Sequence, residues 1–310
     1  MNTTFRCTVL AAALALAGAW PHAGSAQGSA AKAFASPEEA AQALVSALGT
    51  DHADQAQLAA LFGSDWHDYV PTEGVDRSDV EAFLQHYRQR HALDAGPNDT
   101  RVLSVGTPAW ILPVPLAHDA KGWHFDTHAG AVEIRARRIG RNEDAAVQSL
   151  LAYHDAQMDY ASEDHDGDGA LEYARKFLSS DGLHDGLYWA DDDSGQISPL
   201  GPLFGDATPG GDWHGYHFKI LEGQGASAPG GAYSYLIGKH MSRGFAAIAW
   251  PSKYNDTGVM SFMISQDGQI FEKDLGPGSE QAAKAMQRFD PDDSWKAVDA
   301  KEAEDAAKAL

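Results

Sequence analysis

Residues 142–161, NEDAAVQSLLAYHDAQMDYA, decide the fold of the second half of this 310-residue chain. Apolar side chains recur there at the spacing of one helix face, so we expect a helix that runs to about Tyr160. The following segments alternate apolar with polar residues or are continuously apolar, which predicts strands at 216–220, 245–250, 259–264 and 270–271. The Asp267-Gly268 pair predicts a hairpin between the last two. We expect the helix to pack across an antiparallel sheet through Val147, Leu150, Leu151, Met158 and Ala161.

A smaller unit is expected before this helix. The segment SPEE, residues 36–39, combines a capping serine, a proline at the first helical position and a glutamate that closes a capping box. Further helices are predicted at about 55–62 and 78–91, and strands at 109–116 and 122–127. The expected fold class is α+β in two units: helices with a small antiparallel sheet (34–139), then a pilin-like helix packed on an antiparallel sheet (140–296).

The first 26 residues have the pattern of a secretory signal peptide. A single basic residue, Arg6, precedes an apolar run at 9–19 and small residues at 24–26. The alternative, an N-terminal membrane anchor, needs a run of about 20 residues. We therefore expect a periplasmic or secreted protein without a stable membrane anchor. A disordered leader is expected at 27–33 and a flexible helical tail at 297–310.

Composition narrows the class of partner and the sources of stability. The only cysteine, Cys7, precedes the apolar run, so the mature chain has no thiol for a disulfide or a lipid anchor. With 44 acidic and 23 basic residues, the net charge is -21, which argues against nucleic acid as a partner. Basic residues gather only at 135–141, where four arginines are expected to form a solvated helix surface that pairs with carboxylates.

Several phrases of the sequence resemble a known bacterial family. They include FASPEEAAQAL (34–44), GWHFDTHAGAVEI (122–134), RRIGRNE (137–143), HGYHFKILEGQG (214–225) and GFAAIAWP (244–251). Through them the chain resembles the domain-of-unknown-function family numbered 2950 over nearly all of its mature length. This resemblance implies an exported bacterial protein without an assigned activity.

A second resemblance concerns the C-terminal half. The helix of residues 142–161, with the strands and the hairpin that follow it, resembles the globular part of type IV pilins and pseudopilins. In pilins this helix is N-terminal, whereas about 140 residues precede it here. The resemblance therefore implies a similar fold and not membership of a filament.

The strongest local motif is an acidic loop, residues 164–172, DHDGDGALE. It offers oxygen ligands of the kind that calcium prefers, and the predicted metal ligands are Asp164, Asp166, Asp168, Ala170 and Glu172. A full EF-hand is excluded because Arg175 stands where that loop requires glutamate. The alternative is a solvated acidic turn that caps a following helix. A second acidic run, residues 191–193, is interpreted as surface.

No motif for nucleophilic catalysis or zinc binding occurs in the sequence, and the pairs His214/His217 and His124/His128 are interpreted as structural. Three tryptophans in polar surroundings, Trp66, Trp189 and Trp213, either fill cores or bind a saccharide or peptide, and core filling is favoured. We expect a non-enzymatic binding or accessory module for an envelope protein, peptide or saccharide. The alternative is a hydrolase of envelope material with paired carboxylates in residues 164–193. A cleft holding two carboxyl groups of raised pKa would favour the hydrolase.

Overall fold

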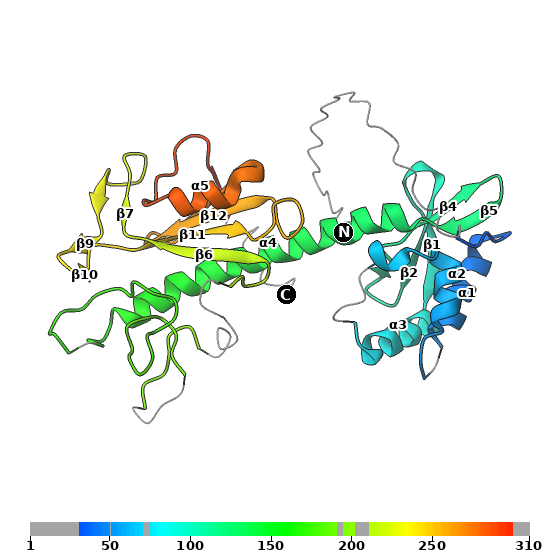
Figure 1. Cartoon of the computed structure of the whole chain (residues 1–310), viewed down its shortest axis with the longest axis horizontal. Helices are drawn as coiled ribbons and strands as arrows, with labels where there is room; N and C mark the ends of the chain where they lie inside the picture. The colour runs from blue at the N-terminus through cyan, green and yellow to red at the C-terminus, as the bar shows by residue number, and fades with distance from the viewer. Residues whose placement is uncertain are drawn as a thin grey trace, which may run out of the picture. The chain divides into compact units, whose positions relative to one another are not determined.

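The computed structural model describes residues 31–49, 51–70, 75–165, 167–190, 195–201 and 211–299. The chain divides into two compact units (Figure 1). The first contains the described residues up to Ala109 together with Leu116–Phe125, and the second contains Trp110–Pro115 and the residues from Asp126 onward. Helices combine with antiparallel sheets in both halves of the chain, so the predicted α+β class is confirmed.

The first unit consists of helices and one small sheet. Its helices are α1 (Pro37–Leu48), α2 (Gln55–Phe62) and α3 (Arg77–Gln89), with a short 3-10 turn at Trp66–Asp68. Its strands are β1 (His91–Ala95), β2 (Arg101–Val105), β4 (Leu116–Asp119) and β5 (Gly122–Phe125), in the order β1-β2-β4-β5 with antiparallel neighbours. The segment β3 (Trp110–Ile111) belongs to the second unit.

Local capping explains where the first helix starts. The Ser36 hydroxyl accepts a hydrogen bond from the Glu39 amide at 3.2 Å, and the Glu39 carboxylate accepts one from the Ala35 amide. Capping by Ser36 is therefore confirmed. The single strand predicted at 109–116 was wrong, because only Trp110–Ile111 and Leu116, the first residue of β4, belong to strands there. The hairpin β1–β2 was not predicted, because β1 is mostly exposed and lacks the alternation that identifies a half-buried strand.

The second unit places one long helix, α4 (Thr127–Tyr160), against a five-stranded antiparallel sheet. The sheet order is β14-β13-β12-β11-β6, and a short helix, α5 (Ser279–Ala285), also packs on β11. The strands are β6 (Tyr216–Leu221), β11 (Ala246–Pro251), β12 (Met260–Ser265), β13 (Ile270–Asp274) and β14 (Lys296–Ala297). Two short hairpins complete the unit: β7 (Gly223–Gln224) with β8 (Tyr233–Ser234), and β9 (Leu236–Ile237) with β10 (His240–Met241).

The core of this unit lies between α4 and the sheet. Val147, Leu150 and Tyr153 are buried on α4, and the Tyr153 hydroxyl donates to the Ala246 carbonyl at 3.1 Å. All six residues of β11 are buried, because α4 and α5 lie on opposite sides of the sheet (Figure 1). The predicted helix on an antiparallel sheet is confirmed, and so is the hairpin at Gly268, which has a positive φ of 75°.

Several predicted boundaries differ from the structure. The helix begins at Thr127, well before residue 142. Its first part was not predicted, because residues 131–144 contribute no buried side chain and so show no helical spacing of apolar residues. Met158 was expected on the buried face but is 51% exposed. At the C-terminal end, Ala297 pairs with Phe271 and Val298 is buried, so the second unit includes the first residues of the predicted tail.

At the other end, the Lys32 amide donates to the Ala60 carbonyl, so the last residues of the predicted leader are held by the first unit. The predicted signal peptide and most of the predicted tail lie outside the described residues. Within the described ranges, no helix combines the length and apolar composition needed to cross a membrane.

Candidate functional site

The acidic loop follows α4 directly and is anchored where it ends. The side chain of Gln157, fully buried on α4, donates from Nε2 to the Ala174 carbonyl and accepts at Oε1 from the Ala174 amide, both at 2.8 Å. The neighbouring Tyr173 amide donates to the Met241 carbonyl of β10 at 2.8 Å. The loop therefore closes back onto α4 and onto the β9–β10 hairpin.

A tight turn at Asp164 opens the loop. Its two carboxylate oxygens accept hydrogen bonds from the amides of Gly167 at 2.8 Å and Gly169 at 2.9 Å. Both glycines have positive φ angles, 74° and 85°, which other residues rarely adopt. The hydrogen bond from Gly169, followed by that from Gly167, lowers the pKa of Asp164 although desolvation opposes the shift. Asp164 is therefore ionised at neutral pH.

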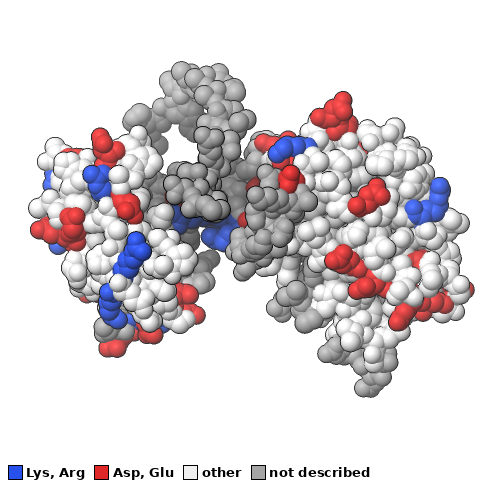
Figure 2. Space-filling model, turned by 180° about the vertical axis from the view of Figure 1, so that it is seen from behind, with Lys and Arg blue, Asp and Glu red and all other residues white. Residues whose placement is uncertain are grey.

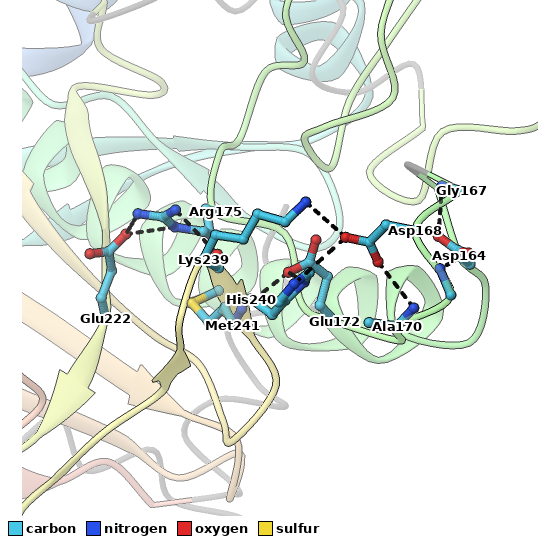
Figure 3. Close-up of polar contacts among 11 residues, drawn as sticks. Asp164, Gly167, Asp168, Ala170, Glu172, Arg175, Glu222, Lys239, His240 and Met241 are labelled. Atoms are coloured by element: carbon cyan, nitrogen blue, oxygen red, sulfur yellow. Dashed lines mark hydrogen bonds and ion pairs between the residues drawn. The ribbon is translucent and has the colours of Figure 1, made fainter.

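The next carboxylate, Asp168, faces the β9–β10 hairpin (Figure 3). Lys239 Nζ lies 2.8 Å from Asp168 Oδ2, and His240 Nε2 lies 3.6 Å from the same oxygen. The other oxygen, Oδ1, accepts from the Ala170 amide at 3.1 Å. The hydrogen bond from Lys239 is the largest cause of the lowered pKa of Asp168. This carboxylate is therefore balanced by a cation from the same chain.

The last acidic residue, Glu172, contacts the same hairpin. Its Oε2 accepts from the Met241 amide at 3.2 Å and lies 3.3 Å from His240 Nδ1. The His240 ring thus lies between two carboxylates, with one nitrogen facing each (Figure 3). Arg175 points away toward Glu222, with Nε 2.8 Å from Oε1. Loop and hairpin are therefore held together by opposite charges as well as by backbone bonds.

The predicted calcium ligands are only partly brought together. Among the described residues, no three acidic, histidine or cysteine side chains are placed to hold a metal ion. Asp166 and the acidic run 191–193 lie outside those residues, so the calcium site stays a prediction. The alternative, a turn that caps a following helix, was wrong, because residues 171–190 contain no helix.

Two of the three tryptophans singled out in the sequence fill cores. Trp66 is 4% exposed and Trp189 is 7% exposed, while Trp213 is half-buried against the core of the second unit. The Trp189 ring stacks on His184 with ring centroids 4.2 Å apart. The interpretation as core residues is confirmed for Trp66 and Trp189.

Two of the four arginines at residues 135–141 of α4 form surface pairs, as predicted. Arg137 pairs with Glu133 at 2.8 Å, and Arg138 pairs with Asp256. Acidic and basic groups are dispersed over the face drawn in Figure 2, where no broad basic surface is seen.

A second carboxylate, not singled out in the sequence, joins α4 to the sheet. Glu143 Oε1 accepts from the amides of Val259 and Met260, each at 2.9 Å. Burial raises the pKa of Glu143 despite these bonds, and the nearby charges of Glu272 and Asp144 add to the shift. It is a single half-buried acceptor that fixes the start of β12.

The hairpin residues that face the acidic loop were also missed by sequence reasoning. Lys239 and His240 lie about 70 residues after the loop, Lys239 in the two-residue turn and His240 at the start of β10, and this hairpin carries no recognisable motif. Only the glycine of that turn, Gly238, gives a local signal of the hairpin.

No curated protein and no solved structure matches the chain, so the resemblance to pilins has no support from such a match. One family model does match, over residues 31–298, and it is described as a protein of unknown function, DUF2950. Since this match spans most of the chain, the protein belongs to the DUF2950 family.

Proposed function

We propose that the protein is an exported, non-enzymatic module of the cell envelope. In this proposal it binds a protein or peptide through the face formed by the acidic loop, residues 164–172, and the β9–β10 hairpin. The observation that carries the proposal is the set of paired charges on this face together with the apolar side chains beside them. Such a mixture is typical of protein interfaces with a polar rim.

Two exposed apolar side chains flank the charged cluster. Leu171, next to Glu172, is 57% exposed, and Ile237 is 58% exposed. Ile237 is the cross-strand partner of His240, so both side chains lie on the same face of the hairpin. Leu183 and Ile197, in the loops that follow, are 55% and 86% exposed. The buried tryptophans Trp66 and Trp189 favour a protein or peptide over a saccharide as the ligand.

The hydrolase alternative, which places its acid and base in residues 164–193, gains no support from the pKa shifts in that segment. Glycoside hydrolysis needs one carboxyl group of raised pKa that stays protonated and donates to the leaving group. The pKa values of Asp164 and Asp168 are lowered. That of Asp185 is lowered too, because hydrogen bonds from Lys176 and Ser180 outweigh its desolvation. In the described part of residues 164–193, these ionised groups suit charge pairing better than acid catalysis.

The proposal also includes calcium, which the same acidic loop would bind. For a cation to reach Asp168, Lys239 has to leave it, and the Lys239 side chain is 67% exposed and can rotate into solvent. Asp164, Asp168 and Glu172 would supply carboxylate oxygens and Ala170 a carbonyl, with Asp166 as a further carboxylate.

A capture experiment tests the proposed binding face. The purified protein and its Ile237→Lys variant are used as baits in a periplasmic extract, with Met158→Lys as the matched control at another exposed apolar position. We expect the wild type and Met158→Lys to retain the same partner and Ile237→Lys to lose it. Equal capture by all three proteins would contradict the assignment of the face.

Export is tested separately. The proposal expects mature protein in the periplasm or medium, with its N-terminus near residue 27. Intact protein that begins at Met1 and is found only in the cytosol would contradict it.

A further inference from the structure

Strand β6 lies at one edge of the sheet of the second unit, where β11 is its only strand neighbour among the described residues (Figure 1). Backbone groups on a strand point alternately to its two sides. Gly215 faces β11, since its carbonyl accepts from the Ser252 amide at 2.9 Å. His217, Lys219 and Leu221 therefore point their backbone groups toward β11, while Tyr216, Phe218, Ile220 and Glu222 point theirs away from it.

The outward groups at both ends of this edge have partners. Tyr216 donates to the Trp213 carbonyl at 3.0 Å and accepts from the Trp213 amide at 2.7 Å. The Glu222 carbonyl accepts from the Tyr235 amide at 3.0 Å. Between these ends, the amides and carbonyls of Phe218 and Ile220 have no backbone partner among the residues that the structure describes.

We infer that this edge of β6 binds a short extended peptide, which adds to the sheet as a sixth strand. Two amides and two carbonyls, two residues apart on one side, form the hydrogen-bonding pattern that an added strand completes. The open part of the edge is short, because the Trp213 turn closes one end and β8 closes the other. If the β6 edge of a second copy paired here, its own Trp213 turn and β8 would meet the Trp213 turn and β8 of the first copy. The open part of the edge therefore favours a separate peptide of about five residues.

The side chains around the edge specify which peptide fits. Phe218 and Ile220 are half-buried on one face of the sheet, and the Phe177 ring lies 6.2 Å from that of Phe218. Lysines on edge strands usually block pairing. Lys219 is engaged elsewhere, because its Nζ donates to the carbonyls of Lys284 at 2.8 Å and Met286 at 2.6 Å. We expect a peptide with β-branched apolar residues at alternate positions.

This edge is distinct from the acidic loop, and the inference does not depend on the function proposed for that face. Amide hydrogen exchange measured by NMR tests it directly. In the free protein we expect the Phe218 and Ile220 amides to exchange at least about tenfold faster than those of Lys219 and Leu221, which bond to β11. The probe is a capped peptide of alternating Thr and Val, about five residues long. At saturation it is expected to slow exchange at Phe218 and Ile220 about tenfold or more.

Two controls isolate strand addition. The same peptide with N-methyl groups on its pairing amides cannot complete the ladder and is expected to protect neither residue. Ile220→Pro removes only an outward amide and is tolerated on an edge strand, so it should fold and lose the protection at Phe218. Ile220→Val keeps the amide and the protection. The N-methyl comparison uses wild-type protein, so the test stands even if Ile220→Pro fails to fold.

Three outcomes would overturn the inference. One is a saturating peptide that leaves both amides unprotected, and another is equal protection by the N-methylated peptide. The third is slow exchange at Phe218 and Ile220 in the free protein. Slow exchange that depends on protein concentration would assign the edge to a second copy, and slow exchange at every concentration would assign it to the chain itself.

Discussion

Gln157 and Ala174 are joined by two hydrogen bonds, in which the side-chain amide of Gln157 bonds to both the carbonyl and the amide of Ala174 at 2.8 Å. The Gln157 side chain also donates to the Tyr153 hydroxyl at 3.1 Å. A fully buried amide with all these partners satisfied joins α4 to the end of the acidic loop.

Gln157→Leu removes this link. Since it leaves the Ala174 amide and carbonyl buried without partners, we expect it to lower the free energy of unfolding by about 1–3 kcal/mol. Urea denaturation measures the change, and Gln42→Leu on the exposed face of α1 is the control. Equal stability of the two variants would contradict the structural role of Gln157.

Lys239→Ala removes the positive charge that lies 2.8 Å from Asp168. If calcium uses this carboxylate, the variant should bind it roughly threefold to tenfold more tightly, because the ion no longer displaces a bound cation. Isothermal titration measures the affinity, and Lys253→Ala is the control for a lost surface charge. Absence of binding heat in both wild type and Lys239→Ala would end the calcium proposal.

Glu143 makes stability depend on pH. Burial raises its pKa in the folded protein, so its contribution favours folding at low pH and is lost as the pH rises through the folded-state pKa. Glu143→Gln keeps an oxygen acceptor for Val259 and Met260 without the charge. We therefore expect the stability of the variant relative to wild type to increase from about pH 4 to pH 8. Urea unfolding across this range measures it, and Glu38→Gln on the exposed face of α1 is the control for removal of a carboxylate elsewhere. A difference that does not change with pH would refute the prediction.

Two glycines should respond to alanine in opposite directions. Gly140 lies inside α4 with nothing within 4 Å of an added Cβ, so Gly140→Ala should stabilise the protein by about 0.5–1 kcal/mol. At Gly258 the added carbon would clash with the Tyr216 hydroxyl, which donates to the Met260 carbonyl at 2.9 Å. Gly258→Ala should therefore cost about 1–3 kcal/mol. Thermal unfolding of the two variants measures both changes in stability. If both variants were stabilised, or both destabilised, the packing described at one of the two positions would be contradicted.

Local signals explain which parts of the fold could be predicted. The Ser36 cap, the hairpin at Gly268 and the apolar run of β11 each depend on residues close together in the sequence. The first half of α4 could not be predicted, because no side chain of residues 131–144 is buried.

The acidic loop was recognised in the sequence, but its pairing with Lys239 and His240 was not. An ion pair between segments this distant leaves no periodic pattern, and the same carboxylates suit a metal or an internal cation equally well.

The anchoring of the acidic loop has a consequence for how the family can diversify. Gln157 and Met241 hold the returning chain by its main chain at residues 173 and 174, so this part of the attachment depends on one buried side chain and on backbone groups. We therefore expect relatives to vary more at the exposed Leu171 than at the buried Gln157.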